Sequence, residues 1–207
     1  MTIYLHEDDL PKNINFNNSI AIDTETMGLK TKRDRLCLIQ ISAGDGDAHL
    51  VKIKSAVVKS TNKHNNLIKV LQNKNVLKIF HFARFDLAAL NHYICKVEGP
   101  IWCTKIASKL SRTYTDKHGL SDLCKELLSI EISKEQQSSN WGRKNISKNQ
   151  KLYAANDVLY LHKIKEELKN FLLQENRLDI AEKIFKFLPI RVDLDLNGFN
   201  DLDIFAH

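Results

Sequence analysis

Four short runs of hydrophobic residues stand out in the first half of the chain. Residues 20–25, 36–42, 48–53 and 76–80 each have the length and the apolar composition of a strand. The second and third runs are separated by a polar turn at residues 44–47, which contains two glycines. The first three runs therefore predict an antiparallel meander, and the run at residues 76–80 predicts a fourth strand.

Between residue 65 and Pro189, apart from the strand predicted at residues 76–80, the hydrophobic residues mostly follow the three- and four-residue spacing of helices. The first helical stripe consists of Leu67, Ile68, Val70 and Leu71. Further helices are predicted over residues 85–93, 104–110, 120–128, 147–172 and 176–188. The start of the long one is well marked, because Ser147 and Gln150 have the spacing of a capping box.

Beyond Pro189 the pattern changes to a period of two, which predicts an extended strand. The alternating apolar residues are Ile190, Val192, Leu194 and Leu196. Strands come first and helices later, an order that predicts one α/β or α+β unit. We therefore expect a single domain over residues 1–207, in which residues 173–207 form a C-terminal helix and an extended tail.

Composition excludes several classes of protein. Hydrophobic residues make up 43% and charged residues 27% of the chain, which is ordinary for a globular protein and too apolar for a disordered one. Neither an apolar stretch of membrane-spanning length nor a signal peptide is apparent, so we expect a cytoplasmic protein without a membrane partner. The four cysteines lack metal-ligand spacing and are expected to be buried thiols. A net charge of +6 suits a polyanionic partner, although codon bias would also produce it.

Asp23 and Glu25 lie two residues apart at the end of the first predicted strand. Side chains alternate along a strand, so both carboxylates point to one face and are close enough to share a cation. A set of carboxylates alone favours hard cations such as Mg²⁺ or Mn²⁺. The alternative is a pair of solvated acids at a strand end.

Two later positions carry further acids. Asp86 follows the fourth predicted strand where the chain enters a helix, and the alternative is an ordinary acid in a first turn. Tyr153 and Asp157 are four residues apart in the capped helix, so both point from one face. Taken alone, that pair is also compatible with a core tyrosine beside a surface acid.

Together, these residues resemble the DEDD superfamily of 3′-5′ exonucleases, in the tyrosine subclass that includes ribonuclease D. The order Asp-x-Glu, Asp and Tyr-x-x-x-Asp carries the resemblance, within residues 21–29, 79–90 and 153–161. Residues 138–141, Ser-Ser-Asn-Trp, resemble another ribonuclease D segment. The histidine subclass would have His at position 152, which is Leu152 here.

The chain also resembles the nano-RNase C group of short ribonuclease D relatives along almost its whole length. The additional matching segments are residues 33–37, 103–110, 112–116, 136–139 and 203–207. Two departures are Asn140, where Asp is expected before the Trp, and Asn156, where small residues are usual. The first removes a charge at that position, and the second is expected to be harmless.

The resemblance implies a ribonuclease H-like α/β fold with a mixed five-stranded sheet flanked by helices. It makes Asp23, Glu25, Asp86 and Asp157 the ligands of two divalent metal ions, Mg²⁺ or Mn²⁺. Tyr153 would orient or help to deprotonate the attacking water; a phenol with a pKa of about 10 is better suited to orientation at neutral pH.

The same resemblance suggests which residues contact the substrate. Leu29 would be a wedge between the last two bases, and Gly28 would allow close backbone approach to a ligand. The alternative for both is a plain turn with a core leucine. Further candidates, each with a structural role as its alternative, are Thr24, Met27, His81, Arg84 and Trp141.

We therefore expect an enzyme, a metal-dependent 3′-5′ exoribonuclease that degrades very short single-stranded RNA to nucleoside 5′-monophosphates. The alternatives are ribonuclease D-type 3′ trimming of tRNA or other structured RNA, and a DNA 3′-5′ exonuclease such as a proofreading subunit. A binding module that has lost catalysis is disfavoured, because all four acids are present.

The end of the chain suggests self-association. Residues 190–207 contain four Asp and one Arg, a net charge of −3, on a chain that is otherwise basic. Their apolar residues include Val192, Leu194, Leu196, Phe199, Leu202, Ile204 and Phe205. Such residues must pack on their own domain or on another subunit. The resemblance to nano-RNase C implies a homo-oligomer, such as an octamer.

Overall fold

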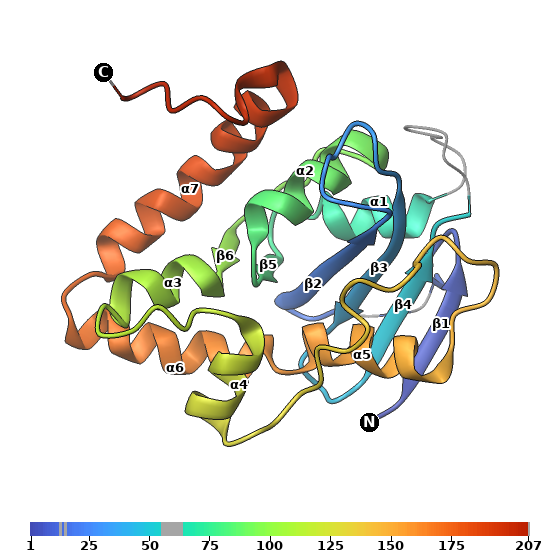
Figure 1. Ribbon diagram of the computed structural model, residues 1–207, viewed down its shortest axis with the longest axis horizontal. Helices are drawn as coiled ribbons and strands as arrows, with labels where there is room; N and C mark the ends of the chain where they lie inside the picture. The colour runs from blue at the N-terminus through green and yellow to red at the C-terminus, as the bar shows by residue number, and fades with distance from the viewer. Residues whose placement is uncertain (13, 15, 55–63, 207) are drawn as a thin grey trace.

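The computed structural model describes residues 1–207 with the exception of 13, 15, 55–63 and 207 (Figure 1). Within these residues a mixed sheet of six strands has the order β1-β4-β3-β2-β5-β6. The strands are β1 Ile3–Glu7, β2 Ser19–Thr26, β3 Leu36–Ser42, β4 Ala48–Lys52, β5 Leu77–Phe80 and β6 Ile101–Cys103.

The predicted meander is confirmed, because β2, β3 and β4 pair antiparallel in chain order. β5 runs parallel to β2 and β6 runs parallel to β5, while β1 adds to the far edge parallel to β4. The α/β class is therefore as expected, but the described sheet has six strands instead of five. The hydrophobic pattern did not predict β1 and β6. β1 is an edge strand whose residues are mostly exposed, and β6 has only three residues.

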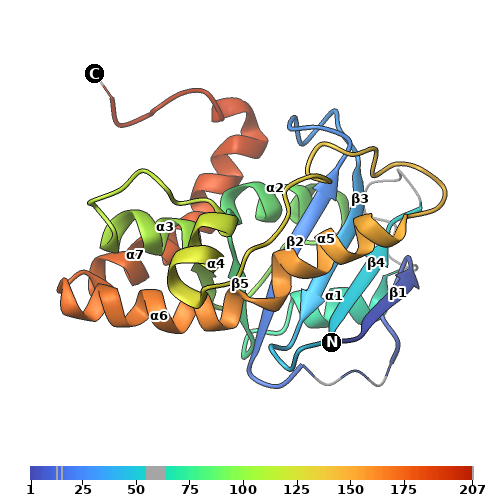
Figure 2. The ribbon, with the colours of Figure 1, turned by 60° about the horizontal axis from the view of Figure 1, so that its bottom comes forward.

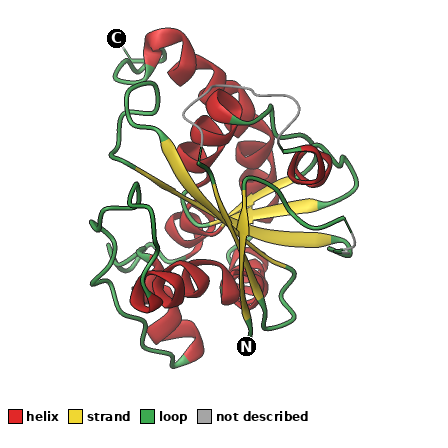
Figure 3. Cartoon of the chain, turned by 90° about the vertical axis from the view of Figure 1, so that its right-hand side faces the viewer, coloured by secondary structure: helices red, strands yellow, loops and turns green. Residues whose placement is uncertain are grey.

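Helices cover both faces of the sheet (Figure 3). α5 crosses in front of β2, β3 and β4, whereas α1 and α2 lie behind them (Figure 2). The remaining helices pack together beyond the β5–β6 side of the sheet. The helices are α1 Asn65–Leu71, α2 Ala83–Tyr93, α3 Thr104–Ser111, α4 Leu120–Leu128, α5 Lys148–Leu159, α6 Leu161–Gln174 and α7 Leu178–Leu194.

The long helix predicted over residues 147–172 is in fact two helices. α5 begins with the predicted capping box, in which the Ser147 side chain accepts from the Gln150 backbone and the Gln150 side chain accepts from the Ser147 backbone. The helix breaks at Tyr160, and α6 begins at the next residue. Val158 and Leu161 are both buried and three residues apart, so the helical spacing continues across the break and does not reveal it.

The extended strand predicted beyond Pro189 is wrong. α7 continues through Pro189 to Leu194, and a π-helical turn follows at Asp195–Phe199. The helix persists because Ala181, Phe185, Leu188 and Val192 form one buried stripe with helical spacing. Burial of that stripe outweighs the backbone hydrogen bond that Pro189 cannot donate.

The core lies between the sheet and its helices and extends from Leu10 to Val192. A second, smaller cluster forms where α5 packs on β3 and β4, and it contains Cys37, Leu38, Leu50, Trp141, Ile146 and Ala154. All four cysteines are buried and none forms a disulfide, as expected. Among the described residues, none of the helices has both the length and the apolar character to cross a membrane.

Candidate active site

Three carboxylates from two elements meet between the sheet and α5. Asp23 and Glu25 project from the same face of β2, and Asp157 approaches from α5, which packs on that strand. One carboxylate oxygen of each lies within 4.8 Å of the other two. The predicted pairing of the first two acids with the acid of the capped helix is therefore present in the fold.

Asp86 reaches the same region from the first turn of α2, on the opposite side of β2. It lies outside the group of three, and its side chain is almost completely buried. The hydroxyl of Thr24 donates to Asp86 Oδ1 over 2.6 Å. Asp86 nevertheless acts on the group electrostatically, because its charge contributes to raising the pKa of Asp23, Glu25 and Asp157.

The four acids share an environment that opposes their ionisation. Burial is the largest cause, and it raises the pKa of Glu25 to about 9, of Asp157 to about 8 and of Asp86 to about 7. The pKa of Asp23 also lies well above its ordinary value, from burial and then from the charges of the other three acids. Such a set of oxygen donors fits hard divalent cations, whose charge would relieve the repulsion.

Tyr153 lies one turn before Asp157 on α5, so the phenol and the carboxylate lie on the same face of the helix. Burial, followed by the charges of the neighbouring acids, raises the pKa of the phenol above its ordinary value. Tyr153 therefore keeps its proton at neutral pH and acts as a hydrogen-bond donor rather than as a free base.

Trp141 packs behind Tyr153 instead of lining an open surface. It is 2% exposed, and its ring centroid lies 6.0 Å from that of Tyr153. The structure thus favours the packing alternative to base stacking. Two hydrogen bonds hold the loop at residues 139–142, which carries Trp141. Gln150 donates to Ser139 Oγ over 2.9 Å, and Arg35 donates to the Gly142 carbonyl over 3.2 Å.

The departure at Asn140 has a local explanation. The Asn140 side-chain oxygen accepts a hydrogen bond from the Gly142 backbone over 3.0 Å. An aspartate could accept the same bond, because this turn needs only a short side chain with an oxygen acceptor. The missing charge therefore leaves the turn intact.

Two of the predicted substrate contacts have structural roles instead. Thr24 is buried and donates its hydroxyl to Asp86, so it orients an acid. The space that Gly28 leaves open is filled by Asp34, whose Cγ would lie 2.8 Å from an added Cβ. Gly28 thus accommodates a side chain of this protein rather than a ligand.

Met27 and Leu29 are exposed beside the site, and Leu29 shows 85% of its surface. That exposure excludes a core role for Leu29 and is compatible with the predicted wedge.

His81 and Arg84 are both engaged within the protein. His81 is partly buried, with its Nδ1 3.0 Å from Thr104 Oγ1, and burial lowers its pKa to about 3, so it is neutral. Arg84 directs two nitrogens to the carboxylate of Asp195, over 2.6 Å and 2.8 Å. The predicted contact of Arg84 with sugar or phosphate is therefore replaced by an ion pair.

Gln40 is a site residue that the sequence pattern did not reveal. It lies opposite Asp23 in the β2–β3 pairing, and its Nε2 donates to Asp23 Oδ2 over 3.1 Å. Its side chain is fully buried although it is polar. A glutamine inside an otherwise apolar strand is a usable signal, but only the strand register connects it to Asp23.

Comparison with known proteins shows the family of the chain. The family model described as 3′-5′ exonuclease matches residues 6–173. The chain belongs to the 3′-5′ exonuclease family. Two structures of NrnC from Brucella melitensis, one with bound Mg²⁺ and one bound to pGG, are each 51% identical to it, with TM-scores of 0.93 and 0.94. The match covers all of this chain and 100% and 99% of theirs. The predicted family and α/β class are thereby confirmed.

Ribonuclease D proteins are more distant members of this 3′-5′ exonuclease family. Ribonuclease D of Jannaschia is 30% identical over 167 residues, which are 79% of this chain and 42% of that protein. The chain thus spans about two fifths of the length of the ribonuclease D relatives that it matches. The structure of Escherichia coli RNase D, at 21% identity and a TM-score of 0.72, shares the fold over 84% of this chain and 45% of its own.

The raised pKa values predict how stability depends on pH without metal. Folded carboxyl groups that titrate near 7, 8 and 9 stabilise the protein fully below about pH 4, and this contribution is lost as the pH rises towards 9. In EDTA the melting temperature should therefore fall between about pH 4 and pH 9. The fall is measured as the slope of melting temperature against pH, relative to that of a control variant. Asp157→Asn should reduce the fall and raise the melting temperature at pH 8.

Asp179→Asn is the matched control, because Asp179 is an exposed acid that pairs with Lys183 on α7. It should keep the slope of the unmodified protein. The melting temperatures are measured by differential scanning calorimetry. If they depend on pH equally in Asp157→Asn and Asp179→Asn, the acids at the site do not have the raised pKa values.

Proposed function

We propose that this protein is a metal-dependent 3′-5′ exoribonuclease that degrades very short RNA to nucleoside 5′-monophosphates. The observation that carries the proposal is the full-length match to NrnC, whose structures contain Mg²⁺ and pGG. The three carboxylates that lie within 4.8 Å of one another support it independently, because they provide a metal centre for phosphodiester hydrolysis.

In this proposal Asp23, Glu25, Asp86 and Asp157 hold two divalent ions, Mg²⁺ or Mn²⁺. Bound there, the ions would supply an activated water and stabilise the leaving oxygen of an in-line displacement. Two neighbouring side chains keep the ligands oriented. Thr24 donates to Asp86, and Gln40 donates to Asp23.

Tyr153 supplies a positioned hydroxyl. Its raised pKa keeps the proton on the phenol, so it orients the attacking water by hydrogen bonding. Trp141 supports the ring from behind, and the capped start of α5 fixes the helix that carries both Tyr153 and Asp157. The hydroxyl and the carboxylate thus move together as one rigid unit.

A second candidate is ribonuclease D-type trimming of structured RNA. The matches to ribonuclease D proteins at 30% identity support it. We favour short RNA because the similarity to NrnC is higher and extends over the whole of both chains. The exposed Leu29 suits a wedge between the two bases of a short substrate.

A time course on end-labelled RNAs of two to seven nucleotides tests the proposal, with Mn²⁺ or with EDTA, and with a tRNA precursor and single-stranded DNA as comparison substrates. We expect nucleoside 5′-monophosphates from the shortest RNA and no product in EDTA. Preferred trimming of the precursor would support the second candidate, and full activity in EDTA would exclude a metal centre.

The division of roles in the site predicts the effect of Tyr153→Phe. Turnover on a diribonucleotide should fall by about 10² to 10⁴, the usual range for a positioned proton-transfer group. Mn²⁺ affinity, measured by isothermal titration calorimetry, should change little, because Tyr153 is not a ligand. Asp157→Asn should lose both activity and metal affinity.

Tyr160→Phe is the control for that substitution, because Tyr160 ends α5 two turns further on. It should retain the turnover of the unmodified protein. A loss of metal affinity in Tyr153→Phe as large as that in Asp157→Asn would contradict the assignment.

We also propose that the protein forms a closed homo-oligomer, such as an octamer, through its last residues. Part of the tail packs on its own chain, since Val192 is buried and Leu196 contacts the core. A group of exposed apolar residues remains beyond it, namely Phe199, Leu202, Ile204 and Phe205. Exposed apolar groups of this kind are typical of contacts between subunits.

A truncation that removes residues 201–207 should therefore yield smaller species in light scattering at unchanged protein concentration. This deletion keeps α7, whose buried stripe belongs to the core, and Asp195, which pairs with Arg84. Ile180→Ser, which changes an exposed apolar residue near the other end of α7, should leave the assembly intact. An unchanged assembly after the truncation would argue against a role for the tail.

The cytoplasm is the proposed location of this activity. None of the four cysteines forms a disulfide, which is the state that a reducing compartment favours.

A further inference from the structure

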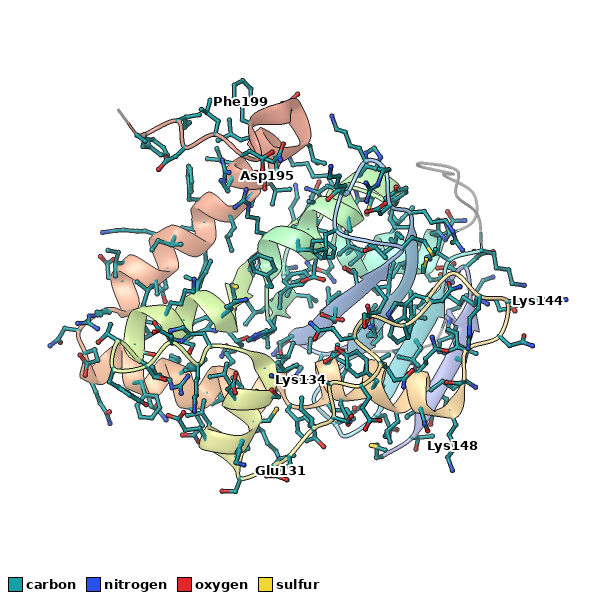
Figure 4. All side chains as sticks on the ribbon, in the orientation of Figure 1. Glu131, Lys134, Lys144, Lys148, Asp195 and Phe199 are labelled. Atoms are coloured by element: carbon teal, nitrogen blue, oxygen red, sulfur yellow. The ribbon has the colours of Figure 1, made fainter. Side chains whose placement is uncertain are left out.

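The turn after α7 is fastened to the helix that carries Asp86. Arg84 lies two residues before Asp86 in the first turn of α2, and its guanidinium binds both carboxylate oxygens of Asp195. The same guanidinium donates to the Asn200 carbonyl over 2.9 Å. Figure 4 shows Asp195 and Phe199 on this turn, next to α2.

A second arginine strengthens the attachment. Arg191 Nη2 lies 3.2 Å from Asp195 Oδ1 and also donates to the Asn200 carbonyl over 3.1 Å. The Asp195 side chain is only 11% exposed, so solvent screens these contacts weakly. Without its charge, Arg84 and Arg191 would both lose the carboxylate that they share.

The turn and the loop after β2 enclose a groove of about 600 Å³. Three segments line this groove: the loop after β2 with Leu29 and the cations at 30–33, the start of α2 with Phe82, Arg84 and Phe85, and the turn with Asp195 and Leu196. This volume lies within the usual range of small-ligand sites. None of the four acids lines the groove, but two of its lining residues are close to them in the sequence: Leu29 follows Glu25 by four residues, and Phe85 precedes Asp86.

The lining of the groove suits a nucleotide. Leu29 and Phe82 are exposed apolar side chains that a base could contact, and Lys105 lies 4.7 Å from the centroid of the Phe82 ring. Lys30 and Lys32 could face a phosphate, whereas Arg33 is paired with Asp34. Asp201 also lines the groove, so a longer phosphate backbone would meet a carboxylate there.

We infer that Asp195 is a positioning residue for the substrate: by holding Arg84 and the turn at residues 195–199, it fixes the wall of the groove that receives the nucleotide on the 5′ side of the scissile bond. This inference rests on the proposed function. It assigns a task to the C-terminal turn within one chain, separate from any contact between subunits.

Asp195→Asn tests the inference, because asparagine keeps the size of the side chain and removes its charge. We expect KM for a diribonucleotide to rise about tenfold, the effect of losing one charge-assisted hydrogen bond. The value of kcat should stay within about twofold, since the acids and Tyr153 are untouched. Selectivity, the ratio of kcat/KM for two nucleotides to that for seven, should fall, because a longer RNA has contacts outside the groove.

Asp193→Asn is the matched control, since Asp193 is two residues away and pairs with Lys96 instead. It should keep the KM of the unmodified protein. Asp195→Glu should restore much of the lost affinity, because it returns the charge. The double variant Arg84→Gln/Asp195→Asn should raise KM no more than Arg84→Gln alone, since the two residues act as one unit.

Three results would overturn the inference: an unchanged KM in Asp195→Asn, an equal rise in Asp193→Asn, or a fall in kcat with KM unaltered. Melting temperatures identify variants that do not fold, and in that case Arg84→Lys and Asp195→Glu provide the same comparison of KM with kcat. Wild-type turnover of the diribonucleotide is measured first. Its absence would refute the proposed function, whereas the variants test only Asp195.

Discussion

The desolvation of four neighbouring carboxylates, together with their mutual repulsion, is the constraint on which the rest of this structure depends. Asp23, Glu25 and Asp157 are brought within 4.8 Å of one another, and Asp86 adds its charge from the other side of β2. Burial and repulsion both raise the pKa values of these groups, so their arrangement costs stability until a cation binds. The surrounding sheet and helices must hold the acids in place against that cost.

The packing around the site meets this requirement with rigid supports. The capping box at Ser147 fixes the start of α5, and the small apolar cluster containing Trp141 holds that helix on the sheet. On the opposite side, the hydroxyl of Thr24 fixes Asp86 at the head of α2. The acids therefore sit on regular elements whose positions are set by the core, which is the arrangement a preorganised metal centre needs.

The C-terminal turn is connected to the same framework through α2. Arg84 binds Asp195 instead of remaining free, and α7 buries a continuous stripe up to Val192. The last part of the chain consequently has two chemically different regions. One is anchored by charge beside the groove, and the other, beyond Asn200, presents apolar residues outward. The roles that we propose in substrate binding and in self-association therefore fall in separate parts of one short segment.

The local pattern of the sequence determined the meander, most helices, the capping box and the acids, because each depends on neighbouring residues. Tertiary structure alone decided the rest. The break at Tyr160 leaves the helical spacing of apolar residues unchanged. The helix continues through Pro189 because α7 buries one face, although the apolar residues after Pro189 also alternate with a period of two. Gln40 reaches Asp23 through strand register, and Arg84 finds Asp195 more than 100 residues away. Such partners are set by the packing of distant segments, which no short stretch of sequence records.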